Sequence, residues 1–587
     1  MTQTDWKPGT QGVIEVRPEE IEDFELQVKR FKAGEWDETE FQAFRLKQGI
    51  YGQRQVDAQM VRVKVPFGGL NADQLDALGE VSDKYVPLSK GHVTTRENFQ
   101  FHHVKIEDTP DFMRVIGTVG LTTREACGNT VRNVTGCPMA GVCADEPFDV
   151  TPYAAAYARY FVRHPYTQAL PRKLKTAFSG CERDCAVTAI HDMGFIPKIV
   201  DGKRGFKVVA GGGTSIMPKI APTLYEFVPV EEYLKVTEAV IRIFNRSDEL
   251  RKNRMKARIK FLIARIGIDE FREMVEEELK QPWTEKSFDP TPLLFLEDES
   301  ADAPVPPPGG YHTNGHLPEF ERWLSTNVRD QRQEGYKTVT VKLPLGDIQV
   351  EQFHQLAELS RKFAGGRCRI TIEQNLAFRW VPEAALLELW QGLTKIGLGE
   401  SGAHDITDIV SCPGTDSCKL GITSSMGLGR AIGEAIGDMA TDDPLVKQMH
   451  VKMSGCPNGC GQHHIADIGF HGAVMKAPGG QVPAYELFLG GSYEDGDARF
   501  GQRIRARVPA KRVPEAVGSV ISYYTEQRNE GEPFKDFVVR VGVKSFEPIL
   551  ESFKETRELD RESLSSYMDW DKTVKYILER GEGECAI

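Results

Sequence analysis

The strongest constraint on this chain is a set of four cysteines that occurs twice. The second set combines a C-x5-C doublet with a C-x3-C doublet and consists of Cys412, Cys418, Cys456 and Cys460. The first set has the same two spacings, and each member lies 275 residues before its counterpart: Cys137, Cys143, Cys181 and Cys185. Equal offsets at four positions indicate an internal duplication, so we predict two related halves in one chain.

Each doublet stands beside glycine or proline, which lets the backbone turn tightly around a compact ligand. We therefore predict that such a quartet binds an iron–sulfur cluster. Zinc is an alternative, although structural zinc doublets are usually narrower than C-x5-C. Disulfides are another alternative, which a reducing compartment disfavours.

Size and composition describe a globular protein with several domains. A chain of 587 residues is too long for one hydrophobic core, and 40% hydrophobic with 27% charged residues is typical of a folded protein. The chain begins with neither a basic nor an apolar signal region and contains no apolar run of membrane-spanning length, so we expect a cytoplasmic protein without a membrane partner. The net charge of −12 argues against general nucleic-acid binding.

The duplication extends beyond the cysteines. A Gln-Arg-Gln motif at 53–55 recurs 278 residues later at 331–333. Apolar periodicity predicts matched elements in the order strand, helix, strand: 61–68, a helix from residue 71 and 92–104 in one half, then 339–346, 350–363 and 368–381 in the other. This order predicts an α+β unit in each half, with the halves packed as pseudo-twofold mates.

Composition shifts set the expected boundaries of these parts. Up to about residue 31 no clear periodicity is present, and prolines beside an acidic run predict a stiff linker between the halves. The predicted parts are an N-terminal extension at 1–50, a first half at 51–285, a Pro-rich linker at 286–316, a second half at 317–548 and a charged, helical C-terminal tail at 549–587.

Two features of the first half suit an anionic ligand. The run of Gly211, Gly212 and Gly213 follows a predicted strand, where backbone N–H groups can approach an anion, although a tight turn needs glycine equally. A helix predicted over 248–266 is rich in lysine and arginine. These cations form a solvated face, or they contact a polycarboxylate cofactor or an acidic electron donor.

The positions at which the halves differ are informative, because duplicated halves diverge where one of them takes on a task. Four permanently cationic residues of the first half have no such counterpart in the second: Arg96 matches Glu373, Arg132 matches Thr407, Lys173 matches Gln448 and Lys175 matches His450. Arginine offers forked donors for oxyanions, and lysine supplies charge and protons. We predict that the four cations form a pocket for a small anion beside a redox centre.

On these residues the chain resembles the assimilatory sulfite and nitrite reductases that carry sirohaem and a 4Fe-4S cluster, over about residues 51–546. The resemblance implies a pseudo-twofold sulfite/nitrite reductase fold with ferredoxin-like half-domains and two larger domains of sirohaem and cluster type. It implies that the second quartet holds the cluster and that Cys460 links it to the sirohaem iron. Cofactor contacts are assigned to Cys460, Asn133, Gly211, Gly212 and Gly213, and the catalytic, substrate-binding cations to Arg96, Arg132, Lys173 and Lys175.

The resemblance favours sulfite as the substrate, reduced by six electrons to sulfide. Sulfite-reducing members have Lys-x-Lys after Pro-Arg, as at Lys173 and Lys175, whereas nitrite-specific members commonly have Asn at the second position. Reduction of nitrite to ammonia, or of both anions, is the alternative.

Two features depart from the simplest family pattern. The first quartet is usually incomplete where one cluster is bound, but here it is intact, so it either binds a second 4Fe-4S cluster or is a relic of the duplication. Tyr51 and Cys127 match positions at which some sulfite-reducing relatives have a Tyr–Cys thioether. An unlinked buried pair is the alternative.

The source of electrons lies outside the chain, because the sequence contains no flavin or nicotinamide motif. We expect ferredoxin as the donor, with a separate flavoprotein as the alternative. Two rival classes share the repeat: a duplicated metal-binding redox sensor, and another sirohaem or corrin-type enzyme of the same fold.

Overall fold

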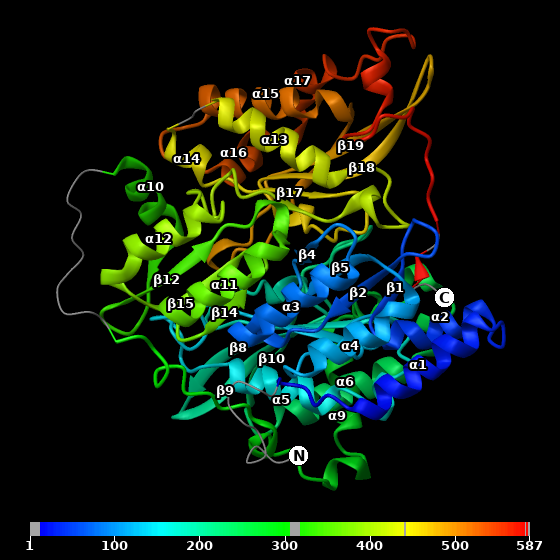
Figure 1. The fold of residues 1–587 in the computed structure, drawn as a ribbon, viewed down its shortest axis with the longest axis vertical. Helices are drawn as coiled ribbons and strands as arrows, with labels where there is room; N and C mark the ends of the chain where they lie inside the picture. Colours follow the sequence, from blue (N-terminus) through cyan, green and yellow to red (C-terminus); the bar gives the residue numbers. More distant parts are fainter. Residues whose placement is uncertain (1–11, 306–316, 440–441, 582, 585–587) are drawn as a thin grey trace.

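The computed structural model describes residues 12–305, 317–439, 442–581 and 583–584. Its strands form four five-stranded sheets. Two of these sheets are small and lie together in the middle of the molecule, and two are larger and lie at opposite ends (Figure 1).

The two small sheets exchange a strand. The first has the order β1 (Ile50–Gly52), β2 (Gln59–Val63), β5 (Phe99–Val104), β4 (Lys90–Val93) and β13 (Asp347–Gln349). The second has the order β11 (Val328–Asp330), β12 (Tyr336–Val341), β15 (Leu376–Pro382), β14 (Arg367–Ile370) and β3 (Gly69–Asn71). Each half thus donates one edge strand to the other half, β13 to β4 and β3 to β14, which confirms the predicted duplicated arrangement.

The two larger sheets have the same topology. One contains β6 (Val131–Gly136), β7 (Leu174–Phe178), β8 (Met193–Val200), β9 (Lys203–Ala210) and β10 (Thr223–Pro229). The other contains β16 (Val410–Ser411), β17 (Val451–Ser454), β18 (Ile468–Ala477), β19 (Gly480–Leu489) and β20 (Gln502–Pro509). In both, the first three strands run parallel and the last two are added antiparallel.

Helices cover the sheets in a matching order. Those of the first half are α1 (Pro18–Lys32), α2 (Glu38–Lys47), α3 (Ala72–Tyr85), α4 (Thr109–Gly117), α5 (Thr151–Phe161), α6 (Tyr233–Arg246), α7 (Asp248–Arg251), α8 (Ile259–Ile266) and α9 (Ile268–Glu278). Those of the second half are α10 (Pro318–Asn327), α11 (Val350–Phe363), α12 (Leu386–Lys395), α13 (Ser425–Met439), α14 (Pro444–Lys447), α15 (Val513–Gln527), α16 (Phe534–Val541) and α17 (Glu547–Glu551).

One hydrophobic core joins the two small sheets. Helices α3 and α11 pack against each other, and Leu78 and Phe353 are fully buried in the same cluster. Asn71 begins α3, because its side chain accepts the Gln74 N–H at 2.8 Å. The predicted helices at these two places are confirmed.

The segments predicted as single strands at 92–104 and 368–381 are hairpins, so that prediction is wrong. The N–H of Thr94 donates to the Asn98 carbonyl at 2.9 Å, and Glu97 has a φ of +53°, which closes a tight turn between β4 and β5. Apolar residues alternate on both arms, so two short strands resemble one longer run. The turn places Arg96 at its tip.

The continuous helix predicted over 248–266 is also wrong. The chain forms α7, a short 3-10 turn at Arg254–Lys256 and then α8. Asn253 is extended, and its side chain accepts the Met255 N–H at 3.0 Å, so a turn interrupts the helix. As a result Arg258 and Lys260 point inward and are buried.

Helix α1 lies in the region where no periodicity was recognised, and α2 follows it within the predicted N-terminal extension. Ile21, Phe24 and Val28 form one buried face of α1, at the helical spacing that the many surrounding charges obscured.

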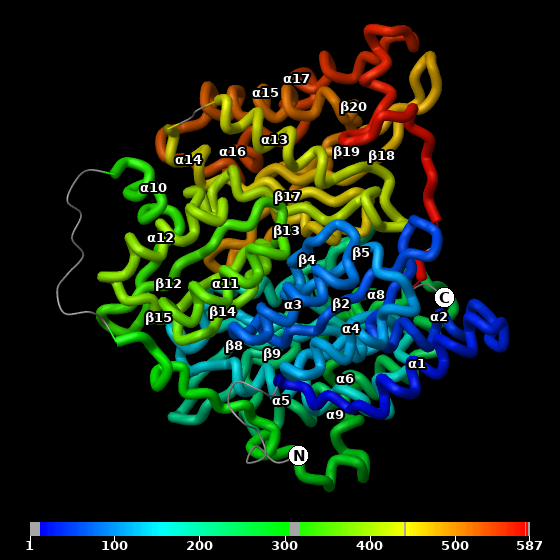
Figure 2. Tube along the Cα trace, viewed as in Figure 1, coloured from blue at the N-terminus to red at the C-terminus, as the bar shows by residue number. Residues whose placement is uncertain are grey.

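The linker before the second half and the tail after it both contact folded parts of the molecule. Glu299, in the predicted linker, accepts hydrogen bonds from Arg369 at 2.9 Å and from Arg379; residues 306–316 of that linker lie outside the described residues. The C-terminal tail contains only short helices, contrary to prediction, and runs down the molecule toward α2 (Figures 1 and 2). There Glu584 pairs with Arg45 at 2.7 Å.

Candidate active site

The cysteine doublets lie at the carboxyl ends of adjacent parallel strands. Cys412 follows β16, and the segment after β17 carries Cys456. Cys137 and Cys181 follow β6 and β7 in the same way. Because the carboxyl ends of parallel neighbours meet at one edge of a sheet, each half gathers its own quartet there.

Backbone packs closely around the second quartet. The N–H of Gly455 points at Cys412 Sγ, 3.3 Å away. A Cβ on Gly455 would lie 2.6 Å from the Cα of Gly414, and one on Gly421 would lie 2.7 Å from the carbonyl carbon of Gly414. Only glycine fits at these positions, so three backbone segments form a cage beside the thiols.

The four thiols of the second quartet influence one another. Burial, and next the nearby thiol of Cys460, raise the pKa of Cys412 to about 12. The same two causes raise the pKa of Cys418 and, more strongly, that of Cys456. Gathered, sheltered thiols ionise when a metal centre compensates their charge, so this donor set fits an iron–sulfur cluster.

Arg96 and Arg132 reach the same place from different elements. Arg96, at the tip of the β4–β5 turn, donates to the carbonyl of Asn133. Arg132, on β6, donates to the carbonyls of Gly128 at 2.8 Å and Ala126 at 3.0 Å. Burial, with the charge of Arg132 acting in the same direction, lowers the pKa of Arg96 to about 10. Both guanidinium groups are therefore anchored and lie close to each other.

Lys173 and Lys175 join this group from β7. Lys173 precedes the strand and Lys175 is its second residue, so the two side chains lie on the same face. Burial first, and then neighbouring cations that include Arg96 and Lys173, hold the pKa of Lys175 well below its ordinary value. The thiol of Cys460 acts on Lys175 in the opposite direction, so the lysine lies within electrostatic range of that thiol.

A pair of hydrogen bonds joins the cations of the first half to the quartet of the second. Thr95, next to Arg96, donates its hydroxyl to the carbonyl of Cys460 at 2.8 Å. Gln462 donates its side-chain amide to the carbonyl of Thr95 at 3.3 Å. Arg96, Lys175 and Cys460 therefore lie close together, with Arg132 beside Arg96 and Lys173 beside Lys175.

The glycine run lies beside this site, where packing also requires glycine. A Cβ on Gly212 would lie 2.4 Å from the carbonyl oxygen of Ala189. The N–H groups of Gly211 and Gly213 donate to backbone carbonyls of the fold. A contact between this run and a cofactor stays a prediction.

Two further cations, Arg258 and Lys260, belong to the predicted basic helix, which was expected either to be a solvated face or to contact a polycarboxylate cofactor or an acidic donor. Both are buried, and the Lys260 ammonium donates to the Thr214 carbonyl at 2.7 Å. Thr214 lies against the glycine that precedes Cys460. No sequence signal separates them from the exposed cations of the same segment, because the alternation over 257–261 runs into helix α8.

Several buried polar atoms around Cys460 lack a partner among the described residues. They are Asn133 Oδ1, Gln462 Oε1, His463 Nε2 and His464 Nδ1. Unsatisfied buried polar atoms are costly unless a ligand completes them. Together with the surrounding cations, they fit a cofactor that carries several carboxylates and a small anion bound next to it.

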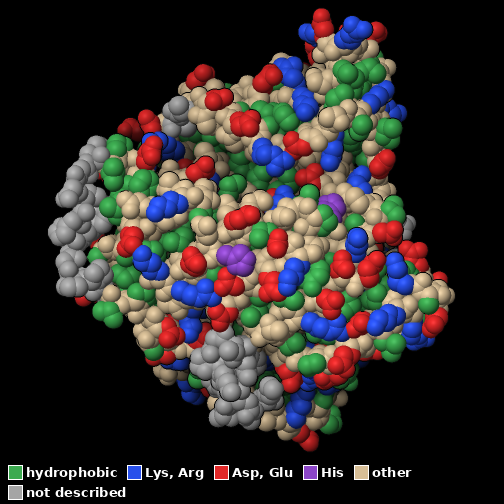
Figure 3. All heavy atoms as spheres, in the orientation of Figure 1, with side chains coloured by type: hydrophobic (Ala, Val, Ile, Leu, Met, Phe, Trp, Pro, Cys, Tyr) green, Lys and Arg blue, Asp and Glu red, His purple; other side chains and the backbone are tan. Residues whose placement is uncertain are grey.

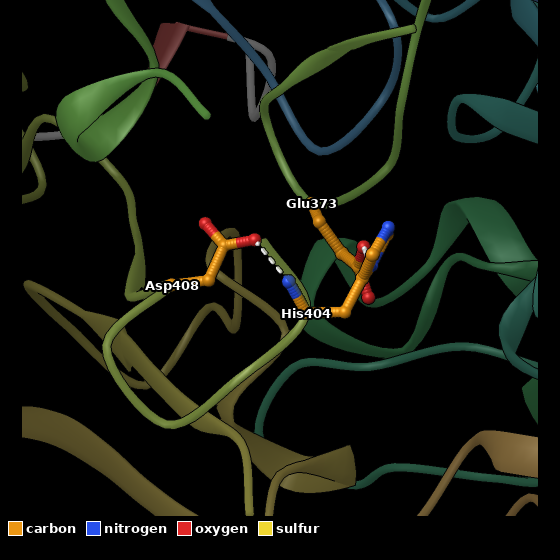
Figure 4. A group of neighbouring side chains, drawn as sticks. All are labelled: Glu373, His404 and Asp408. Atoms are coloured by element: carbon orange, nitrogen blue, oxygen red, sulfur yellow. Dashed lines mark hydrogen bonds and ion pairs between the residues drawn. The ribbon is translucent and has the colours of Figure 1, made fainter. Parts of the chain in front are cut away.

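The corresponding place in the second half is closed by internal pairing. Glu373, the counterpart of Arg96, pairs with His404 at 2.5 Å and accepts a hydrogen bond from Tyr493 at 2.5 Å. The backbone N–H of His404 donates to Asp408 at 2.9 Å (Figure 4). Glu373 is thus paired within its own half, and the counterpart of Arg96 adds no positive charge to this face.

Tyr51 and Cys127 are neighbours in the structure. Tyr51 packs against a small buried cluster that contains Cys127, Leu46 and Met60. Arg62 donates to Cys127 Sγ at 3.2 Å. The pair is placed for contact, and a covalent link between them stays a prediction.

Comparisons with known proteins agree with this architecture. Residues 127–283 and 402–556 match the nitrite and sulphite reductase 4Fe-4S domain, and residues 51–119 and 329–396 match the nitrite/sulfite reductase ferredoxin-like half domain. The chain is thus an oxidoreductase, and it belongs to the nitrite and sulfite reductase family, as its sequence indicated. This membership favours the enzymatic prediction over the redox sensor.

Named relatives divide between two substrates. The chain is 31% identical over 487 residues to a sulfite reductase (ferredoxin) of Mycobacterium tuberculosis, covering 82% of each protein. It is 29% identical over 471 residues to a ferredoxin–nitrite reductase of Synechococcus elongatus, covering 79% of this chain and 85% of the relative. The solved structure of the NirA protein of Mycobacterium tuberculosis matches with a TM-score of 0.75 at 27% identity, over 90% of this chain and 96% of that one.

Among the described residues, no helix has the length and apolar character needed to cross a membrane.

Proposed function

We propose that this protein is an assimilatory sulfite reductase, which reduces sulfite to sulfide with six electrons from a separate donor. One observation carries the proposal: Lys175 of the first half lies within electrostatic range of both Arg96 and Cys460, the terminal cysteine of the second-half quartet, and Thr95 is hydrogen-bonded to the Cys460 carbonyl. Family membership supplies the reaction class. The cations supply a binding site for an oxyanion.

We propose that Cys412, Cys418, Cys456 and Cys460 hold a 4Fe-4S cluster and that Cys460 also ligates sirohaem. The gathered thiols fit the cluster, and the buried cations Arg258 and Lys260 fit the haem carboxylates, with Asn133 and the Gly211, Gly212 and Gly213 run beside them. When bound, these cofactors supply electrons and an iron that takes the sulfur of sulfite.

The residues of the chain bind the anion and provide protons. Arg96 and Arg132 are fixed by backbone carbonyls, so their positive charge is in place before the anion arrives. Lys175 releases a proton more readily than an exposed lysine, because its pKa is held low by burial and by neighbouring cations. Protons delivered there let the three oxygens of sulfite leave as water, while Lys173 adds positive charge.

Sulfite is favoured over nitrite by the second lysine of the Lys-x-Lys pair. An asparagine at position 175 would bring neither charge nor an exchangeable ammonium proton. Sulfite carries more negative charge than nitrite, so it gains more from the added cation. Nitrite reduction is the alternative, because named relatives include both activities.

Ferredoxin is the proposed donor, and a separate flavoprotein is the alternative. The sulfite reductase of Mycobacterium tuberculosis and the nitrite reductase of Synechococcus elongatus are both named for ferredoxin. The exposed segment of Arg251, Lys252, Arg254 and Lys256 lies a few residues before the buried Arg258, so it offers basic surface close to the site. On the face drawn in Figure 3, acidic and basic side chains are interspersed, so that face offers no comparable basic segment among its coloured residues.

Two smaller proposals accompany this function. We expect the protein to work in the cytoplasm, where thiols remain reduced. We also propose a thioether between Tyr51 and Cys127, whose side chains lie in one buried cluster. Mass spectrometry of the peptides that contain the two residues would show the link as a loss of two hydrogens.

The proposed activity is tested by steady-state reduction of sulfite and of nitrite by the full chain loaded with its cofactors, driven by reduced ferredoxin or a viologen. Sulfide and ammonia are both quantified. Sulfide release with a higher kcat/KM for sulfite is expected. Ammonia with little sulfide would identify a nitrite reductase and refute the assignment from Lys175.

A further inference from the structure

We propose that the first-half quartet, Cys137, Cys143, Cys181 and Cys185, binds a second iron–sulfur cluster, and that no haem accompanies it. Sulfur ligands in this number are typical of such clusters. The proposal does not depend on whether sulfite or nitrite is the substrate, because none of these cysteines lies among the substrate-binding cations.

The first quartet stands on the same backbone as the second. The Cys137 N–H donates to the Phe178 carbonyl at 3.0 Å, and the Cys412 N–H donates to the Met453 carbonyl at 3.4 Å. Each pair of residues is separated from the other by the 275-residue offset. A Cβ on Gly180 would lie 3.3 Å from Cys137 Sγ, so glycine again lets backbone approach the thiol.

Each cysteine loop is braced by the Gln-Arg-Gln motif of the opposite half. The N–H of Arg54 donates to the Ser417 carbonyl at 3.0 Å, and the N–H of Arg332 donates to the Val142 carbonyl at 2.7 Å. Ser417 and Val142 immediately precede the second cysteine of their doublets. The first-half loop is thus held by the same bond as the loop that we assign to the cluster.

The glutamine that ends each motif adds a second bond. Gln55 donates its amide to the Asp416 carbonyl at 2.8 Å, and Gln333 donates to the Gly141 carbonyl at 3.3 Å. These partners, too, are equivalent by the repeat. A duplicated loop whose metal had been lost would not need cross-half bonds at both positions.

The thiols themselves are gathered and reduced. All four are free, and Cys137 interacts with Cys185 as Cys143 does with Cys181. Arg183 donates to Cys143 Sγ at 3.6 Å, which favours a thiolate. The quartet is therefore available for metal binding.

The first-half cysteine loop has side chains at the two positions where the second-half cysteine loop has glycines packed against each other. Met139 and Glu146 stand at the positions of Gly414 and Gly421. The Glu146 carboxylate accepts the Gly141 N–H at 2.7 Å and lies 3.3 Å from Arg332. In the first half, the Glu146 carboxylate thus holds the cysteine loop together in place of the glycine packing, so the loop still encloses its thiols.

No haem fits beyond the first quartet. Val187, two residues after Cys185, packs with Ile372 and Tyr493 in a buried apolar cluster. Glu373 occupies the position that Arg96 has on the catalytic side. A cluster held by the first quartet would therefore supply electron transfer alone, without a substrate of its own.

The test is a count of metals and sulfide in the full-length protein purified with its cofactors. Two clusters and one haem predict about nine iron atoms and about eight acid-labile sulfides per chain. About five irons and about four sulfides per chain would overturn the proposal. The same count together with one zinc atom would identify a zinc site, and the same count with fewer free thiols than expected would identify disulfides. That count with neither would show that the first quartet binds no metal.

A variant assigns the additional iron to these residues. The double change Cys143→Ser and Cys185→Ser is expected to lose about four irons and about four sulfides. The matched control is Cys368→Ser, a buried thiol outside both quartets, which is expected to keep the full count. An unchanged count in the double variant would refute the site, and the count in the unaltered protein decides the matter if the variant does not fold.

Discussion

The two halves share a backbone but differ beyond the last cysteine of each quartet. On the Cys460 side, Thr95 and Gln462 are polar and bind the cysteine loop. On the Cys185 side, the equivalent positions are apolar: Ile372 and Val187 belong to a buried cluster. The difference shows how a duplicated scaffold can carry a single active site. Both cysteine loops are kept, but the side chains next to Cys185 are apolar and those next to Cys460 are polar.

The cations follow the same division. Lys175 of the first half lies within electrostatic range of the Cys460 thiol and of Arg96, whereas Glu373 in the second half is paired with His404. Each half therefore contributes a different component to the single site that we propose. The strand exchange through β3 and β13 holds these components in a fixed relation.

The largest expected effect separates the two terminal cysteines. Cys460→Ser is expected to lower the kcat for sulfite by more than about 10³-fold, because the thiol that joins the proposed cofactors is lost. Cys185→Ser is expected to cost less than about 10-fold when a viologen, which does not need the second cluster, supplies electrons. Steady-state rates measure both, and equal losses would contradict the division between the halves.

The next effect compares Arg96 with its counterpart. Arg96→Gln is expected to lower kcat/KM for sulfite by about 10²-fold, because an anchored positive charge is removed from the anion site. Glu373→Gln is the matched control and is expected to change kcat/KM by less than about threefold, although it weakens the pair with His404. Loss of activity in Glu373→Gln alone would place the anion site in the second half and contradict the proposal.

The exchanged strands are expected to contribute equally to stability. Ile348 on β13 and Leu70 on β3 are buried in the shared core. Changing either one to alanine is expected to lower the free energy of unfolding by about 3 kcal/mol, because a large apolar side chain leaves a cavity. Denaturant unfolding measures both variants. A cost at only one strand would show that the halves are held together asymmetrically.

A smaller effect concerns how the stability of the two domains that contain the larger sheets depends on pH. Glu486 on β19 is buried, which by itself would raise its pKa, but His471, Arg507 and Arg503 outweigh burial and lower the pKa from 4.5 to about 2. A lowered folded-state pKa stabilises the protein above about pH 4.5, and this contribution is lost as the pH falls toward about 2.

Glu486→Gln is therefore expected to remove about 2 kcal/mol of stability at pH 7 and much less near pH 2. Lys207, at the matching place in the first half, is the control position, and Lys207→Gln should show no comparable acid-dependent change. Urea titrations at several pH values measure both variants. A loss that is independent of pH would contradict the ionised state of Glu486.

Much of the organisation follows from spacing alone. The 275-residue offset predicted two related halves, and the helix over 350–363 is found with those bounds. Strand exchange could not be predicted, because β3 and β13 are three-residue segments whose partners lie far away in the sequence. The hairpin at Arg96 was missed because apolar alternation continues across a short polar turn.

The candidate site was predictable where the two halves could be compared. The four cations stood out because their counterparts differ, and in the structure Lys175 lies within electrostatic range of Arg96, Lys173 and Cys460, while Arg132 lies within range of Arg96. Arg258 and Lys260 were placed in one continuous basic helix, either solvated or in contact with a cofactor or donor, because the break at Asn253 depends on a local side-chain hydrogen bond. Thr95 and Gln462 carry no sequence signal, since their role arises from a contact across the two halves.

The central claim is that the cations of the first half select the anion, and Lys175→Asn tests it most directly. In the cofactor-loaded enzyme, this change is expected to lower kcat/KM for sulfite at least about 10-fold more than kcat/KM for nitrite, with sulfide and ammonia measured as products. Lys198→Asn, on the outer part of β8 near Glu226, is the matched control and should leave both values alike. Equal losses for the two anions in Lys175→Asn would contradict the account.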